Sequence, residues 1–231
     1  SLSINARPIK GDPLGLSLEP DARLGLLGIE LHSRRRNRLS TRIIEASEGE
    51  IKLAVDQSFG NCPQYIQARE LERLTPETVP EAQIEKLLQL DFDSRALIQG
   101  SDSFFVSSYV DNKSGQASEG ADVSHRGGRP GFIRIDKDGT LTIPDYSGNN
   151  HFNTFGNFIE NGRAGLLFLD FEQGHVLMLT GTVEILWDSP ETKYFEGAQR
   201  LWQFRIDHGY RIKHGLPLRW SLNEYSPQTL N

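Results

Sequence analysis

Cysteine, long apolar runs and basic charge are all scarce in this chain of 231 residues, and each scarcity excludes a class of protein. The single cysteine, Cys62, excludes an intramolecular disulfide and is typical of a reducing compartment, so we expect a cytoplasmic protein. No apolar run approaches the length of a membrane span, and residues 1–7 lack the apolar core of a signal peptide. The net charge of -6 argues against a nucleic-acid partner, because such binding needs a basic face.

The glycine patterns of P-loops and Rossmann folds are also missing, yet one segment has the chemistry of a phosphate site. Arg134 lies on an expected strand, and the polar residues 147–157 then open a short helix. A helix start with amides, a hydroxyl and a nearby arginine suits a phosphate. Helix capping explains one or two of these polar residues, and Arg134 could instead be a solvated arginine on an edge strand. The candidate phosphate-binding residues are Arg134, Asn149, Asn153, Thr154 and Asn157.

Ser124, His125 and Arg126 form a second candidate group, followed by two glycines that allow close backbone approach. His125 has no second histidine or carboxylate at metal-ligand spacing, so we expect no zinc site. It is either a loop histidine bonded to the backbone or a donor beside a ligand, and it is the one candidate acid or base. Together, His125 and Arg126 favour an anionic ring system or an anionic substrate.

The stretch 57–66 is unusual in composition and is expected to build a pocket wall. Cys62 has no histidine nearby in the sequence, which argues against a Cys–His catalytic pair. Side-chain amides and an aromatic ring in this stretch could contact an aromatic ligand. The candidate residues are Asn61, Cys62, Gln64 and Tyr65.

An internal repeat appears when the sequence is compared with itself at an offset of 140 residues. Residues 22–31 then align with residues 162–171, and both segments contain Arg-x-Gly-Leu-Leu. The register continues, since Leu39 falls on Leu179. We therefore divide the chain into a partial first repeat, 1–75, and a second unit, 76–231, packed together.

Four arginines fall within five residues of the first repeat, in an otherwise acidic protein. They are either a solvated hairpin tip or a group that attracts an anionic substrate or the acidic loops of a partner subunit. These arginines are Arg34, Arg35, Arg36 and Arg38.

Short apolar runs separated by turn residues predict a mainly β protein, a β-barrel with peripheral helices. Asp138-Gly139 is typical of a hairpin turn. Apolar spacing predicts helices over 80–90, 94–99 and 190–206. The expected strands are 24–31, 36–46, 50–57, 103–110, 131–136, 140–144, 164–171 and 175–187.

Five stretches of the chain resemble the pyridoxamine 5'-phosphate oxidase-like family of FMN-binding split β-barrels, especially its long bacterial members. The resemblance implies a split barrel that binds FMN, usually at the interface of a homodimer, and the partial repeat at the N-terminus is added to this barrel. These stretches are 57–67, 122–132, 143–157, 165–171 and 179–184.

Two departures from the family pattern accompany this resemblance. Arg134 matches the arginine on the strand before the flavin-phosphate segment, but Asn153 and Thr154 stand where the oxidases carry a basic pair. The first repeat also begins later than in long members, so the chain is expected to be a fragment, a processed form or a naturally short member.

The leading functional hypothesis is a flavin-dependent oxidoreductase, in which hydride passes between a small-molecule substrate and flavin N5. The resemblance also allows a separate electron-transfer reductase as partner. The alternative on the same barrel is a non-catalytic protein that binds a flavin, haem or another tetrapyrrole, with His125, His151 or His175 as the candidate histidines. A third hypothesis, an anion- or nucleic-acid-binding regulator that uses the arginine run, conflicts with the overall acidity.

Overall fold

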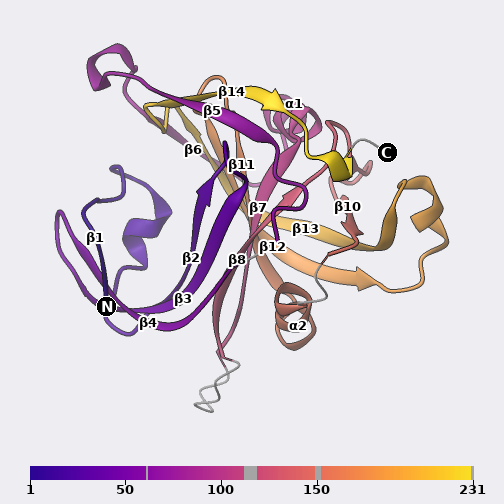
Figure 1. Ribbon diagram of the computed structural model, residues 1–231, viewed down its shortest axis with the longest axis horizontal. Helices are drawn as coiled ribbons and strands as arrows, with labels where there is room; N and C mark the ends of the chain where they lie inside the picture. The colour runs from indigo at the N-terminus through magenta and orange to yellow at the C-terminus, as the bar shows by residue number, and fades with distance from the viewer. Residues whose placement is uncertain (61, 112–118, 149–151, 230–231) are drawn as a thin grey trace.

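The computed structural model describes residues 1–60, 62–111, 119–148 and 152–229. Its largest sheet has the order β8-β7-β11-β12-β13-β10-β9, with β6 pairing to β13 off this path, and all of its pairs are antiparallel (Figure 1). The strands are β6 (Gln83–Leu87), β7 (Ser103–Val110), β8 (Gly120–Gly127), β9 (Arg134–Ile135), β10 (Leu141–Tyr146), β11 (Arg163–Leu169), β12 (Val176–Leu186) and β13 (Ala198–Lys213).

The curled large sheet encloses the main apolar core. Phe104, Phe168 and Trp202 are fully buried there, and the rings of Phe104 and Phe168 stack with centroids 5.2 Å apart. Alternate residues of β11, such as Leu166 and Phe168, point into this core, as expected for strands with one buried face. The predicted fold class, a mainly β barrel with peripheral helices, is confirmed.

Among the described residues, two α-helices pack against this sheet, and both occur where helices were predicted. α1 (Phe92–Gly100) contains the predicted helix 94–99 and begins at Asp91, whose carboxylate accepts a hydrogen bond from the Ser94 N–H at 2.9 Å. α2 (Asn153–Glu160) is the short helix expected after the polar segment. In the part of the chain that the structure describes, short 3-10 helices span Pro13–Leu16, Pro76–Thr78, Pro190–Tyr194 and Pro227–Thr229.

Two other predicted helices are wrong. The range 80–90 contains β6, which pairs with β13 through Ile84 and Ile212, and the pairing puts Leu87 in the core. The range 190–206 holds only the 3-10 turn before Gly197, which has φ +76°, followed by β13. The apolar residues that have helical spacing in this range are in part also spaced at every second position, as in a strand. They are buried because β13 pairs with β12 on one side and with β10 on the other. The predicted strand 131–136 shortens to the two residues of β9.

A separate four-stranded sheet belongs to the first repeat and has the order β1-β4-β3-β2 (Figure 1). The expected strands there are confirmed. They are β2 (Arg23–Glu30), β3 (Arg35–Ala46) and β4 (Ile51–Gly60), with β1 (Leu2–Ile4) added at the edge.

The β2–β3 and β11–β12 hairpins share one register. Leu26 pairs with Leu39 in the first, and Leu166 pairs with Leu179, each 140 residues later, in the second. The sequence repeat therefore corresponds to a repeated antiparallel pair.

A third, two-stranded sheet joins the end of the first repeat to the C-terminal strand. β5 (Ala68–Arg73) pairs with β14 (Leu218–Glu224), so a segment from before residue 75 lies beside the C-terminal strand. This pairing crosses the boundary predicted between the two units.

Candidate functional site

A small cavity of about 90 Å³, which we call the arginine cavity, lies where β3 of the first repeat meets β8 of the large sheet. Its walls also come from the segment after β4, from β10 and from the start of α2. The sequence-predicted residues that line it are Cys62, Gln64, Tyr65, Ser124, His125, Arg126 and Thr154, joined by Arg36, Arg38, Asp145, Tyr146 and Phe155.

Three guanidinium groups dominate the walls of the arginine cavity. Arg36 donates from Nη1 to the His125 carbonyl at 3.3 Å, but its buried Nε has no hydrogen-bond partner among the described residues. Arg126 donates to Asp145 at 2.7 Å, and its Nε likewise has no partner in the described part of the chain. Arg38 is 4% exposed and lies 3.4 Å from Asp122.

These positive charges affect one another and favour an anion. Burial lowers the pKa of Arg36 to about 10, and the nearby Arg38 and Arg126 act in the same direction. The guanidinium groups remain charged at neutral pH, while Asp145 is the only carboxylate among the described residues of the wall. An anionic ligand would relieve this repulsion and accept hydrogen bonds from the N–H groups that lack a partner among the described residues.

His125 is as deeply buried in the cavity as Arg38, with 4% of its surface exposed. Neither ring nitrogen has a hydrogen-bond partner among the described residues, and the ring packs edge-on against Phe105, with centroids 5.7 Å apart. Burial holds the pKa of His125 well below its usual value, and Arg36 and Arg126 add to this effect. The imidazole is therefore neutral at pH 7, with one N–H free to donate to a ligand.

The start of α2 reaches the arginine cavity through Thr154 and Phe155. Its N-cap residue, Phe152, makes no side-chain capping bond, so the first N–H groups have no side-chain cap within the described part of the chain. The Thr154 hydroxyl lies 3.3 Å from Asp122.

The polar residues predicted around this helix separate in the structure. Asn153 is exposed and does not line the cavity, and the Asn157 amide donates to Ser108 at 3.0 Å. Asn149 and Asn61 lie outside the described residues.

A larger cavity of about 750 Å³, the aromatic cavity, adjoins the first and shares Tyr65, Phe132 and Tyr146 with it. The Tyr65 and Tyr146 ring centroids are 5.4 Å apart. Burial raises the pKa of Tyr146 to about 12, so its phenol stays protonated. The other walls include Gly128, Arg129, Pro130, Gly131, Tyr194, Phe195, Gln228 and Thr229.

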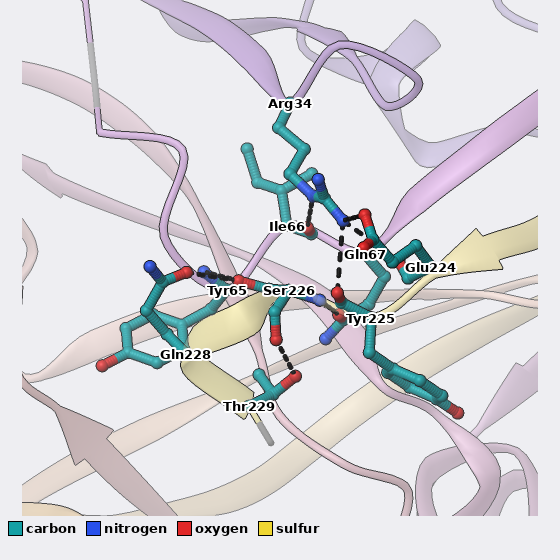
Figure 2. Close-up of polar contacts among 9 residues, drawn as sticks. All are labelled: Arg34, Tyr65, Ile66, Gln67, Glu224, Tyr225, Ser226, Gln228 and Thr229. Carbon is teal, nitrogen blue, oxygen red and sulfur yellow. Dashed lines mark hydrogen bonds and ion pairs between the residues drawn. The ribbon is translucent and has the colours of Figure 1, made fainter. Parts of the chain in front are cut away.

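Tyr65, which borders both cavities, is held in an uncommon backbone conformation with φ +65°. Its N–H donates to Ser226 Oγ at 3.2 Å, and its phenol donates to the Ser147 carbonyl at 2.7 Å. Figure 2 shows Tyr65 beside Ser226 and Gln228 of the C-terminal segment. Contacts from distant parts of the chain thus fix the residue that separates the two cavities.

Arg134 lines the aromatic cavity and not the arginine cavity. Its guanidinium donates to Asp136 at 2.7 Å and to Glu191 at 2.6 Å, so two carboxylates offset its charge. Hydrogen bonding to Glu191 raises its pKa. The structure therefore separates Arg134 from Ser124, His125 and Arg126, which it brings together.

Sequence reasoning left Arg36 and Arg38 undecided between solvent and an anion, and it missed Asp145 and Tyr146. The signal for the arginines was their density in an acidic chain. Their position depends on the packing of β3 against β8, which connects residues more than 80 apart.

Comparison with protein families decides the relationship. The family model for pyridoxamine 5'-phosphate oxidase matches residues 93–219, more than half of the chain. The chain belongs to the pyridoxamine 5'-phosphate oxidase family. The match contains β8, β10 and α2 of the site, whereas Arg36, Arg38 and Tyr65 precede it.

Several solved structures are similar to this family member at low identity. HupZ from Group A Streptococcus has 17% identity and a TM-score of 0.39, over 54% of this chain and 92% of its own. A Clostridium acetobutylicum protein of the pyridoxinephosphate oxidase family, related to a general stress protein of B. subtilis, has 17% identity and a TM-score of 0.39, over 56% and 92%. The FAD binding protein from Mycobacterium smegmatis has 13% identity and a TM-score of 0.38, over 54% and 96%.

These likenesses carry no argument about ligand or activity. No curated protein matches the chain. Among the described residues, no helix is both long and apolar enough to cross a membrane.

Proposed function

We propose that this protein binds a flavin, specifically FMN, with the phosphate in the arginine cavity and the ring system in the aromatic cavity. The observation that carries the proposal is the pairing of a small cationic cavity with a large aromatic one across Tyr65 and Tyr146. A cavity of about 90 Å³ is too small for a whole cofactor but suits one compact anionic group. Family membership supports the flavin, and the charge of the cavity supports a phosphorylated one.

The residues of the arginine cavity fit a phosphate in detail. The buried N–H groups of Arg36 and Arg126 and the neutral imidazole of His125 lack partners among the described residues. Such groups are costly to leave unpaired, and phosphate oxygens would accept from all three. The start of α2, which has no side-chain cap among the described residues, adds backbone N–H groups on the same side.

We further propose a flavin-dependent oxidoreductase. A bound flavin supplies hydride and electron transfer, and the protein's own side chains bind and orient it. The protonated Tyr146 phenol and the neutral His125 imidazole provide hydrogen-bond donors without a charge change near pH 7. The expected substrate is a small molecule, anions included, and electrons could come from a separate reductase.

The absorption spectrum of the purified protein, with mass analysis of any released ligand, is the first test. We expect flavin bands and the mass of FMN. A Soret band would instead support the tetrapyrrole-binding alternative, and a colourless protein that does not take up added FMN would contradict the proposal.

A pair of arginine variants then locates the phosphate. We expect Arg126→Ala to weaken FMN binding by about 1.5–3 kcal/mol, the scale of a lost hydrogen bond to a charged group. Asp145 keeps a neighbour in this variant, because Arg200 lies 3.7 Å away. Arg134→Ala is the comparison variant, since its guanidinium lines the aromatic cavity and is already paired with two carboxylates.

Titration of both variants with FMN, followed by flavin fluorescence, measures the loss of affinity in each. A larger loss of affinity in Arg134→Ala than in Arg126→Ala would place the phosphate at the residue favoured by the sequence alone.

A further inference from the structure

The arginine cavity takes its walls from both repeats of one chain. Arg36 and Arg38 lie on β3 of the first repeat, whereas His125 and Arg126 lie on β8 of the second unit. The Arg36 guanidinium reaches across to the carbonyl of His125 itself, at 3.3 Å. A ligand between them therefore touches both repeats.

The two repeats are not equivalent at these positions. The offset of 140 residues relates Arg36 to Val176 and Arg38 to Met178, on the corresponding strand β12. Val176 is buried in an apolar cluster, with Met178 packed against it. The arginines thus belong to the first repeat alone, which indicates a specialised role and not a duplicated site.

Close packing holds the first repeat in this position. A Cβ on Gly25 of β2 would lie 2.9 Å from the backbone of Asp122 on β8, so the two strands approach as closely as glycine allows. Arg38 and Asp122 form an ion pair beside this contact, and both side chains are almost fully buried.

The far end of the same hairpin is also fixed. Arg34 donates to the Ile66 carbonyl at 3.0 Å and to the Glu224 carboxylate at 2.7 Å, as Figure 2 shows. The geometry is therefore set by contacts within the chain at both ends of the hairpin.

We propose that the first repeat completes the anion site of the second repeat within the same chain, with Arg36 and Arg38 as ligands of the anion. A single chain then carries the whole site, and no residue from a second copy is required, whether or not the protein dimerises. The identity of the anion as flavin phosphate rests on the function proposed above.

Comparison of FMN with riboflavin tests the role of Arg36. Both share the ring, but riboflavin lacks the phosphate. We expect Arg36→Ala to weaken FMN binding by about tenfold or more, which is the scale of a lost charge-assisted hydrogen bond. The affinity for riboflavin should not change. Arg35→Ala is the matched control, because Arg35 is exposed on the same strand. An unchanged ratio of FMN to riboflavin affinity in Arg36→Ala would overturn the assignment.

Mixing two defective variants tests whether the site lies within one chain. Arg36→Ala and Arg126→Ala are co-expressed with different tags. FMN binding is then measured on the complexes that carry both tags and on each variant alone. If the site spanned two chains of a dimer, about one quarter of all sites in a random mixture would regain both arginines. We expect no recovery, because each chain keeps its own defect; recovery of that fraction would refute the proposal.

Inorganic phosphate separates this proposal from the flavin assignment. We expect phosphate to raise the unfolding temperature of the wild type, and we expect Arg36→Ala, Arg126→Ala and their mixture to lose this shift. If FMN fails to bind while phosphate gives this pattern, the result supports the anion site within one chain and contradicts the proposal that its ligand is a flavin. If FMN and phosphate both fail with wild-type protein, the anion site itself is refuted.

Discussion

Burial in the arginine cavity disfavours the charged forms of its titratable side chains. His125 stays neutral because it is buried among arginines, and Arg36 has a lowered pKa for the same reasons. Each group without an internal partner costs folding energy, so these side chains favour binding over stability. A phosphate would supply the hydrogen-bond acceptors that the described residues do not.

The neutral state of His125 has a consequence for stability in acid. Its folded pKa is lowered, so the unfolded chain binds a proton more readily, and stability falls as the pH drops below about 6.5. Between pH 7.5 and 5.5, we expect the free energy of unfolding of the flavin-free protein to fall by up to about 1.4 kcal/mol through this group.

Urea unfolding of wild type and His125→Gln at both pH values measures this contribution. The burial of His175 lowers its pKa as well, so only the difference between the two proteins reports on His125. The exposed His32 provides a matched control, His32→Gln. An equal loss of stability in wild type and His125→Gln would show that His125 is already protonated or solvated.

At the scale of elements, charged side chains join α1 to the large sheet. Arg211 on β13 is 8% exposed and pairs with Asp91 at the start of α1 and with Glu85 on β6. Asp91 therefore has two roles, as the N-cap of α1 and as an ion-pair partner.

Two substitutions separate these roles. Asp91→Asn keeps a good capping residue but removes the charge, whereas Asp91→Ala removes both. We expect Asp91→Ala to destabilise by about 2–4 kcal/mol and Asp91→Asn by less, since an N-cap contributes about 1 kcal/mol. Urea midpoints measure the difference, with Asp93→Ala, an exposed and more distant neighbour of Arg211, as the control. Equal effects of Asn and Ala at position 91 would rule out a capping role.

At the scale of the whole molecule, the first repeat and the C-terminal segment meet beside the aromatic cavity. The C-terminal segment lines the aromatic cavity through Gln228 and Thr229, and Gln67 accepts a hydrogen bond from the Ser226 N–H at 2.7 Å (Figure 2). Arg34 binds the same segment from the first repeat. Stability and site geometry are therefore coupled through this junction.

Loss of the Arg34 contacts should weaken the junction. We expect Arg34→Ala to lower the free energy of unfolding by about 1.5–3 kcal/mol, because it removes hydrogen bonds from a charged group to Ile66, Glu224 and Tyr225. Thermal and urea unfolding measure this effect against the exposed Arg35→Ala. We also expect faster proteolysis of the C-terminal segment. An unchanged rate of proteolysis would show that Arg34 does not hold this segment in place.

Local patterns in the sequence determined much of this protein. Short apolar runs between turn residues identified the strands of the first repeat, and the polar segment located the start of α2. The offset of 140 residues matched two hairpins of the same register. Residues around Ser124 and Cys62, which were expected beside a ligand, line one cavity. These features depend on nearby residues, or on side-chain types that a pattern records.

Only the tertiary structure decided the features that depend on distant partners. The ranges 80–90 and 190–206 contain strands because pairing with the large sheet outweighs their helical spacing. Arg134 is offset by Glu191, 57 residues away, and Arg36 enters the site because β3 packs on β8. An arginine has the same sequence signature in solvent, in an ion pair or beside a ligand, so its partners are known only once the chain has folded.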